Sequence, residues 1–356
     1  MADGRMPTAD EITVGIVGCG RCTVFGHLPA LARMRDRFRV VAVCDVEKSR
    51  RERIERDFPD VRHYRRLEDM VEDRDIKLVL IATPTLSHEA MSIECLGRGL
   101  WTVCETPVAI SHEGALALRA ASLKAGGRLI PAIPALFSNE FRLASMAGAR
   151  KDIGNLYDIR IRHGLYRRRR DWQSTLKRAG GVLRFAAQEP VLQALSLLHA
   201  PPVQMWSETK KIVSLGDAED YVRLLMRTAD GVTADIEVNS AELAADAPAI
   251  ALRGSRGSFS VMPGAASGLC RMIDPSQKFE KHRSSVALPP LEVDSEEVRI
   301  IEETVEVPDP MPPYEAFWGA VYAAASGNGP FPVDFDLVVE MVRYIGIAGK
   351  PAPIAI

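Results

Sequence analysis

The sequence is poor in several features that mark specialised classes of protein. Its 356 residues include only six cysteines, aromatic residues make up 6%, and 45 Lys+Arg nearly balance 47 Asp+Glu. Scattered cysteines form no disulfide framework, so we expect a reducing, cytoplasmic location. A formal charge of −2 gives no electrostatic reason to expect nucleic acid or an anionic membrane as a partner.

Long apolar runs and metal-ligand spacings are also missing. No apolar stretch approaches the roughly 20 residues of a membrane-spanning helix, so we expect no membrane partner. No cluster of histidine, cysteine and carboxylate residues has the spacing of metal ligands, and we predict no metal site. Met1–Glu11 is polar and acidic, unlike a secretory signal, and we expect a loose tail there.

The length exceeds the size at which one hydrophobic core usually keeps growing, so we expect two domains. Up to about residue 132, short apolar runs rich in Val and Ile alternate with helical stretches. Such runs are typical of strands buried on both faces of a parallel sheet, here Ile12–Val17, Val40–Cys44, Leu78–Ala82, Trp101–Cys104 and Leu129–Ala132. Repeated strand–helix–strand units predict a doubly wound α/β domain over residues 11–134.

Beyond this domain the apolar pattern changes to a period of two residues. Tyr157–His163 and Val232–Val238 both alternate, and further strands are expected at Val203–Thr209, Tyr221–Thr228 and Ala249–Arg253. This alternation predicts a sheet with one covered face. Helices are expected at Asn139–Gly148, Glu189–Leu198, Tyr314–Ser326 and Phe335–Ala348. We predict an α+β domain over residues 135–356, with an open, mainly antiparallel sheet.

A glycine turn follows the first expected strand. Gly18 and Gly20 permit a tight turn and a close approach of backbone to a pyrophosphate, whose charge the next helix N-terminus meets. The second strand ends in Asp45, where a carboxylate accepts hydrogen bonds from both ribose hydroxyls of NAD. NADP remains possible, because four residues that could receive its 2′-phosphate follow, namely Lys48, Ser49, Arg50 and Arg51. The pattern predicts a Rossmann domain that binds NAD.

Two other interpretations of this turn are open. Cys19 and Cys22 form a C-x-x-C motif, which at a helix start can be a redox couple. Because the motif overlaps the turn that a pyrophosphate would occupy, coincidence is the favoured interpretation. A glycine turn that binds nothing is the other alternative.

Further segments extend the pattern along the chain. They are Val14–Gly20, His27–Leu31, Val43–Asp45, Ile81–Pro84 followed by His88, Cys104–Pro107, Asp171–Gln173 and Gly180–Leu183. In this order and spacing the sequence resembles the Gfo/Idh/MocA family of NAD(P)-dependent sugar and inositol oxidoreductases. The resemblance implies a nicotinamide between the two domains and a C-terminal sheet that commonly forms the oligomer interface. We therefore expect a homo-oligomer, a dimer or tetramer.

The resemblance also implies site residues. Residues of the turn and of the second strand would hold the cofactor, namely Gly18, Gly20, Arg21, Cys22 and Asp45. Thr83, Pro84 and His88 would flank the nicotinamide ribose, and Glu105 would lie beside the nicotinamide.

The sequence departs from the family at its proton-transfer residues. Thr106 replaces a lysine that tunes this step and orients the substrate, and Glu189 replaces the usual acid/base histidine. The family's Asp, Gly and second Asp are replaced in turn by Phe185, Ala187 and Leu192. Loss of an acid/base group typically costs about 10²–10⁴-fold in rate.

Three hypotheses follow. Glu189 substitutes for the histidine if burial raises its pKa, or it is only a solvated helix N-terminal glutamate favoured by the helix dipole and by Pro190. Alternatively, the substrate needs little help, as when hydride is added to a C=N or conjugated C=C bond. In the third hypothesis the chain binds nucleotide without chemistry and acts as a partner subunit or sensor. We prefer hydride transfer to or from a small polar substrate with non-standard proton handling, in which Glu189 and Thr106 are the candidate catalytic residues.

Substrate-binding candidates lie in one basic segment. Tyr166, Arg168 and Trp172 belong to the run Tyr166–Trp172, which contains four consecutive arginines and suits an acidic or phosphorylated substrate. A basic surface loop is the alternative. His163 lies on the apolar side of its expected strand, either facing the cleft or in the core.

Overall fold

The computed structural model describes residues 11–244, 246–279 and 297–349. The first domain contains a six-stranded sheet of order β3-β2-β1-β4-β5-β6, in which every neighbouring pair is parallel. Its strands are β1 (Ile12–Val17), β2 (Phe38–Cys44), β3 (Arg62–Tyr64), β4 (Leu78–Ile81), β5 (Trp101–Glu105) and β6 (Leu129–Ala132). The predicted doubly wound sheet is confirmed. β3 was missed because this short edge strand, Arg-His-Tyr, has no apolar run.

Helices connect these strands. They are η1 (Thr23–His27), α1 (Leu28–Arg33), α2 (Lys48–Glu55), α3 (Leu67–Met70), η2 (Thr85–Ser87), α4 (His88–Gly97) and α5 (His112–Lys124). The hydroxyl of Ser111 caps α5 by accepting from the Gly114 N–H at 3.0 Å. The π-helical segment η1 runs directly into α1, and its last residue is His27.

The second domain contains an eight-stranded sheet of order β14-β13-β12-β11-β7-β10-β9-β8. Its strands are β7 (Leu156–Gly164), β8 (Pro202–Lys210), β9 (Tyr221–Thr228), β10 (Thr233–Asn239), β11 (Ile250–Gly254), β12 (Gly257–Val261), β13 (Ser267–Ile273) and β14 (Ile300–Glu306). Only the central pair β7 and β10 is parallel, so the sheet is mainly antiparallel, as predicted. The alternation in β7 also follows the prediction, since Ile159 and Ile161 are fully buried between half-buried arginines.

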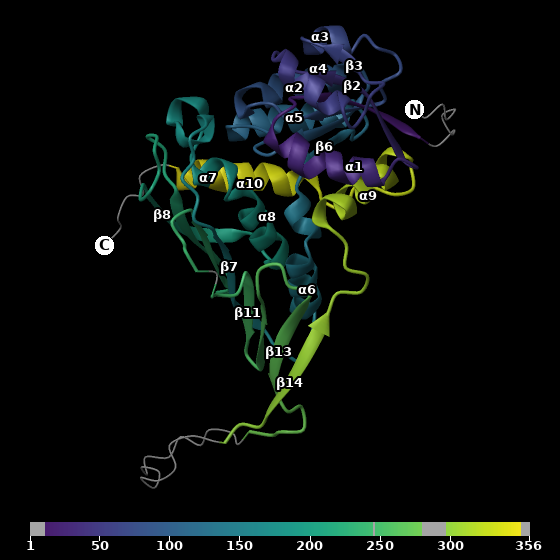
Figure 1. The fold of residues 1–356 in the computed structure, drawn as a ribbon. Coiled ribbons are helices and arrows are strands. Elements are labelled where there is room, and N and C mark those ends of the chain that lie inside the picture. The colour runs from purple at the N-terminus through teal and green to yellow at the C-terminus, as the bar shows by residue number, and fades with distance from the viewer. Residues whose placement is uncertain (1–10, 245, 280–296, 350–356) are drawn as a thin grey trace, which may run out of the picture.

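The remaining helices are η3 (Pro134–Phe137), α6 (Asn139–Gly148), η4 (Trp172–Ser174), η5 (Leu176–Arg178), α7 (Val182–Phe185), α8 (Gln188–Leu197), α9 (Pro313–Ala325) and α10 (Phe335–Ala348). They include α6, α7, α8 and α10, which pack against the second sheet, and α9, which packs against η3 and α1 (Figure 1). In Figure 1 the yellow helices α9 and α10 lie between the first domain and the second sheet. Ion pairs tie both helices to the first domain, Arg33–Glu315 at 2.6 Å and Arg119–Asp336.

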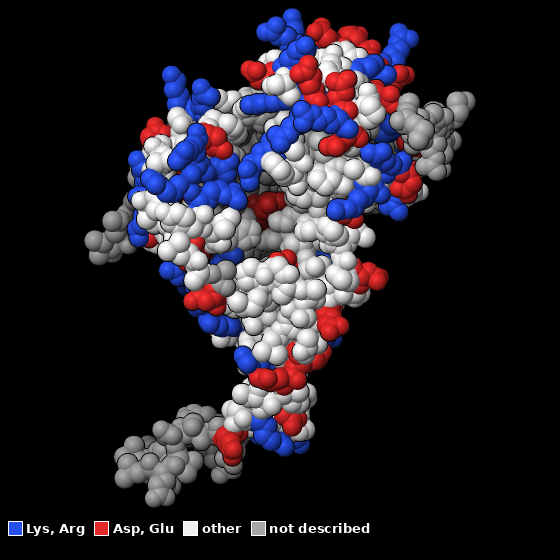
Figure 2. Space-filling view, viewed as in Figure 1, with Lys and Arg blue, Asp and Glu red and all other residues white. Residues whose placement is uncertain are grey.

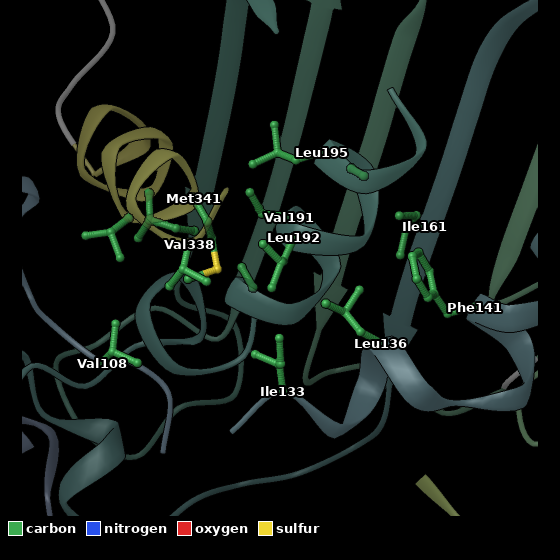
Figure 3. Packing of buried hydrophobic residues seen from close by; sticks show 14 of the residues in the cluster. Val108, Ile133, Leu136, Phe141, Ile161, Val191, Leu192, Leu195, Val338 and Met341 are labelled. Carbon is green, nitrogen blue, oxygen red and sulfur yellow. The ribbon is translucent and has the colours of Figure 1, made fainter. Parts of the chain in front are cut away.

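The two domains share one apolar core at this junction. Figure 3 shows Val108 and Ile133 of the first domain beside Val338 of α10 and Leu192 of α8. Because burial of such side chains stabilises by roughly 1.5–3 kcal/mol each, the junction holds α8 in place against the first domain. The start of α8 is therefore fixed relative to the end of β5.

Candidate active site

The glycine turn at the end of β1 is closely fitted. Gly18 has φ +90°, and a Cβ there would lie 2.4 Å from the carbonyl oxygen of Ala82. The hydroxyl of Thr23 donates to the carbonyl oxygen of Gly18 at 2.5 Å, so Thr23 closes the turn. At Gly20, by contrast, a Cβ would meet no atom within 4 Å. This open space at a helix start fits the pyrophosphate of a dinucleotide.

Asp45 lies at the end of β2 and is only 8% exposed. Its Oδ2 accepts from the Cys19 N–H at 2.9 Å, and its Oδ1 accepts from the Glu47 N–H at 2.9 Å. Each carboxylate oxygen retains a second acceptor position, which leaves room for the ribose contact that the sequence predicts. Arg50 lies 3.7 Å from Oδ2. Thus a cation is also available beside the expected position of the 2′-hydroxyl.

The loop after β4 leads into His88, which is predicted to flank the nicotinamide ribose. The residue is buried, at 1% exposed. Nδ1 lies 2.8 Å from the carbonyl oxygen of Pro107 and Nε2 lies 2.7 Å from that of Thr83. Because carbonyl oxygens only accept, both ring nitrogens donate and the ring is a buried cation. The interaction with Cys104 and, to a smaller extent, these two bonds outweigh burial, and together they raise the pKa of His88 to about 9.

Thr83 and Pro84 remain on the surface of this loop. Thr83 is half-buried and its Oγ1 lies 2.7 Å from the hydroxyl of Ser87, while Pro84 is exposed. Both stay available for the predicted ribose contact. Arg21 and Cys22, at the first turn of the helix after Gly20, are likewise exposed.

The C-x-x-C pair shows no sign of redox activation. Both cysteines are free thiols, and burial raises the pKa of Cys19, the buried one of the pair, to about 12. Reactive thiols have lowered pKa values, so the geometry favours the coincidental interpretation.

Glu105, at the end of β5, belongs to a chain of three side chains. Its Oε1 lies 2.7 Å from Nε2 of the fully buried His27, and Nδ1 of His27 lies 3.2 Å from the indole nitrogen of Trp318. An indole N–H is only a donor, so Nδ1 must accept and Nε2 must carry the proton. His27 therefore donates to the Glu105 carboxylate, with its ring orientation set by a helix of the second domain.

Glu189 lies in the first turn of α8 and is half-buried. Its Oε1 accepts from the Ala135 N–H at 3.1 Å, and Gln193, one turn later, donates to the carbonyl oxygen of the same residue at 2.9 Å. Burial raises the pKa of Glu189 to about 7, the negative charge of Glu105 adds to this, and the bond from Ala135 opposes it. The alternative of a fully solvated glutamate is not what the structure shows.

Four segments bring their polar groups together around these carboxylates. The four groups are Cys22, Glu105, Glu189 and Tyr314. The pKa of the Tyr314 phenol is raised by burial and by the charges of the other three groups. A Cβ on Gly26 would lie 2.4 Å from the ring of Tyr314, so this glycine allows the ring its place. Figure 2 shows acidic side chains at the floor of a hollow between the two halves of the molecule, with lysines and arginines around it.

A cavity of about 380 Å³ lies in the second domain. Its polar and aromatic lining includes Glu140, His163, Arg167, Arg169, Phe185 and Asn239. His163 follows Ile161 on the helix-covered face of β7, is exposed and lines this cavity.

The other predicted substrate residues lie outside this lining. Arg168 directs its Nε to the carbonyl oxygen of Val213 at 3.2 Å, Tyr166 is 45% exposed, and Trp172 is half-buried in η4. The basic run therefore divides, with Arg167 and Arg169 on the cavity.

The positions that depart from the family pattern are mostly apolar. Ala187 and Leu192 are fully buried, and Leu192 packs in the core shown in Figure 3. Phe185 carries the Arg169 guanidinium 5.1 Å above its ring. Thr106 is half-buried and donates its backbone N–H to Glu105 at 3.3 Å. Among these positions, only Glu189 offers a group that titrates near neutrality.

Sequence reasoning missed His27, Tyr314 and Trp318. His27 stood in a segment typical of the family, but no pattern in the sequence indicates that it pairs with Glu105. Trp318, 291 residues away, gives no signal beyond that of a packing residue.

Comparison with known proteins identifies the family. Residues 12–132 match the oxidoreductase family with an NAD-binding Rossmann fold, and residues 141–260 match the Gfo/Idh/MocA C-terminal domain. The chain belongs to the Gfo/Idh/MocA oxidoreductase family, and its first domain is the NAD(P)-binding domain.

Named relatives are similar over a shorter stretch. The inositol 2-dehydrogenase of Burkholderia multivorans is 29% identical over 120 residues, 33% of this chain and 35% of the relative. The scyllo-inositol 2-dehydrogenase (NADP(+)) of Bacillus subtilis is 34% identical over 116 residues, 32% of this chain and 31% of the relative. The aligned region thus spans about one third of either relative.

Solved structures share the whole fold. The WlbA dehydrogenase of Bordetella pertussis, in complex with NADH and UDP-GlcNAcA, superposes with a TM-score of 0.74 at 20% identity, covering 96% of each chain. An NAD-binding protein from Listeria innocua gives a TM-score of 0.77 at 20% identity, covering 94% of this chain and 93% of its own.

Residues 11–244, 246–279 and 297–349 contain no group of three or more histidine, cysteine or carboxylate side chains that could hold a metal ion. No helix there combines the length and apolar character needed to cross a membrane.

Proposed function

We propose that this protein is an NAD(P)-dependent oxidoreductase that exchanges hydride with a small polar substrate, and that Glu189 transfers the accompanying proton. The observation that carries the proposal is the carboxyl of Glu189, buried beside Glu105 with a pKa of about 7. A group that titrates near the working pH is suited to be both acid and base. The substrate would be sugar-like, cyclic, or an imine or enone.

The two carboxylates take different roles in this proposal. His27 donates to Glu105, which holds that carboxylate in place as an acceptor at the nicotinamide end of the cleft. Glu189 accepts only one hydrogen bond from the described residues, at Oε1. Oε2 is then free to give a proton to the substrate or take one from it. Pairs of carboxyl groups with environments this different commonly divide acid and base work.

Thr106 contributes because it places no positive charge at this position. A lysine at this position would put an ammonium group next to Glu105, and a nearby positive charge lowers the pKa of a carboxyl. A neutral threonine therefore helps Glu189 to remain protonated near neutral pH. NAD(P), when bound, supplies the hydride acceptor or donor.

The relatives support this substrate class. Two of them are named as dehydrogenases of inositols, which are cyclic polyols, and one of these names states NADP(+). A cyclic polyhydroxy compound would match the size of the 380 Å³ cavity and could bind the polar side chains within its lining, such as Arg167 and Asn239.

We also propose a homo-oligomer that works in the cytoplasm and joins through the second sheet. The sheet carries ordered ion pairs on its half-exposed face. Arg223 holds Asp235 through two bonds of 2.9 and 2.7 Å, and Asp158 pairs with Arg160 and Arg253. Fixed charges of this kind give a polar surface a defined pattern for a second copy to match.

The test is Glu189→Gln, assayed by NADH absorbance with a panel of inositols, sugars, imines and enones. Turnover should fall about 10²–10⁴-fold, because the amide cannot transfer a proton, while NADH affinity stays within about twofold. Glu208→Gln, on the exposed strand β8, is the matched control and should keep full turnover. Full activity of Glu189→Gln would contradict the proposal. So would a wild-type protein that binds NADH yet turns over nothing in the panel, which is the behaviour of a silent nucleotide-binding protein.

A further inference from the structure

Two arginines of the cavity, Arg167 and Arg169, differ in the hydrogen bonds and ion pairs that their guanidinium groups form. Arg169 forms two bonds to Asp171, of 3.1 and 2.6 Å, and stacks on Phe185. Arg167 lines the same cavity, but its guanidinium makes no hydrogen bond or ion pair with any residue that the structure describes. Burial and the charges of Arg169 and Arg21 lower the pKa of Arg167, and the charge of Asp171 opposes them. Arg167 thus feels a nearby carboxylate without being hydrogen-bonded to it.

Carboxylates near this cavity are already engaged by backbone. Glu140 accepts from the Gly264 N–H at 2.6 Å, and Glu219 accepts from the Leu183 N–H at 3.1 Å. Asp220 accepts from the N–H groups of residues 212 and 213 at 2.6 and 2.7 Å. Among the described residues, none of these acids forms an ion pair with Arg167.

Arg169 connects the cavity to the region of the proposed proton transfer. It lines the cavity, and its charge lowers the pKa of Cys22, which Glu105 and Glu189 raise. Phe185 and Ala186 line the cavity three or four residues before Glu189, which is not itself part of the lining. Arg169 and this short segment therefore lie between the cavity and Glu189.

We propose that the substrate carries one anionic group, a carboxylate or a phosphate, which binds between Arg167 and the Asp171-anchored Arg169. This inference rests on the proposed function, since it describes the substrate of the same site. A guanidinium presents two parallel N–H donors that match the oxygens of either anion. Asn239 and Ser240, which also line the cavity, are suited to the hydroxyl groups of a polyol attached to the anion.

The test compares three probes by ligand-observed NMR, namely glucose, glucuronate and glucose 6-phosphate. The two anions should show saturable binding at least tenfold tighter than glucose. The tighter of the two identifies the anionic group. Arg167→Ala should weaken both anions at least tenfold and leave glucose unchanged. Arg170→Ala, in the same run but outside the cavity lining, should leave all three affinities within twofold.

Two further variants make the outcome decisive. Arg167→Lys keeps the charge without the paired donors and should lie between wild type and Arg167→Ala, which also covers a failure of the alanine variant to fold. Glu189→Gln should bind the two anions as tightly as the wild type does. If this variant binds the anions in preference to glucose and also keeps full turnover, the proposed function is overturned but the anion proposal is not. Glucose binding as tightly as the anions, absence of anion binding, or equal losses in Arg167→Ala and Arg170→Ala would overturn the anion proposal.

Discussion

The nucleotide-binding turn and the cleft below it are built in opposite ways. The turn is one continuous segment, Gly18–Thr23, whose fit depends on backbone conformation and on a single hydroxyl. The cleft joins Cys22, Glu105, Glu189 and Tyr314, which four separate segments supply. A backbone turn tolerates few changes, whereas a cleft assembled from side chains can exchange its chemical groups while the frame stays.

That difference bears on where the sequence analysis predicts departures from the family pattern. The predicted departures leave both glycines of the turn and the aspartate of the strand after it in place. They fall in the cleft, at the lysine, the histidine and the aspartates of the pattern, and Glu189, the residue predicted at the histidine position, has a raised pKa. The frame that holds it is the shared apolar junction of Figure 3.

The largest expected effect is that of an alanine at Gly18, which should differ from that of an alanine at Gly20. Gly18→Ala puts a Cβ 2.4 Å from a backbone oxygen at a positive φ, so it should lower the melting temperature and weaken NADH more than about 100-fold. Gly20→Ala meets no protein atom and should melt as the wild type does, while still weakening NADH. Calorimetric titration and thermal melts measure both. Unchanged NADH affinity in Gly20→Ala would show that the pyrophosphate lies elsewhere.

A second prediction concerns His88, which links the loop after β4 to the one after β5. The pKa of His88 rises from 6.5 to about 9 on folding, so its protonation stabilises the folded state. This contribution is complete below pH 6.5 and is lost as the pH rises through 9. The free energy of unfolding should fall by about 3 kcal/mol over that range. His88→Gln should lose this slope in urea titrations, whereas His199→Gln, at an exposed position, should keep it. A wild-type slope in His88→Gln would contradict the buried cation.

The smallest effect tests the assembly of the cleft. Trp318→Phe removes the indole N–H from Nδ1 of His27, which leaves a buried acceptor unpaired and should cost about 2 kcal/mol of folding stability. ¹⁵N NMR should show His27 protonated at Nε2 in the wild type and a mixture of tautomers in the variant. Trp206→Phe, on the exposed edge strand β8, is the control and should change stability by less than about 0.5 kcal/mol. A mixture in the wild type would refute the three-residue chain.

The sequence predicts the fold well because its elements rest on local patterns. Strands β1 and β6 and helices α6 and α10 have the predicted limits, since each is bounded by turn residues and has a consistent apolar period. β12 was missed because Gly257–Val261 alternates weakly and contains only two buried side chains. The polar strand β3 gives no periodic signal at all.

The site is less predictable because its contacts are long-range. Glu189 is a candidate from its position, but its burial depends on how α8 packs against η3, which no local pattern encodes. The pairing of His27 with Glu105 joins residues 78 positions apart. In the run of four arginines the sequence analysis selects Arg168, whereas the path of the loop places Arg167 and Arg169 on the cavity.

The titration of Glu189 tests the account most directly, because it needs no substrate. The ¹³C resonance of its Cδ, assigned by comparison with Glu189→Gln, should shift with a midpoint near pH 7, and Glu105→Gln should lower that midpoint by removing a neighbouring negative charge. A midpoint near 4.5, the ordinary value for a glutamate, would contradict the claim that this carboxyl has taken over proton transfer.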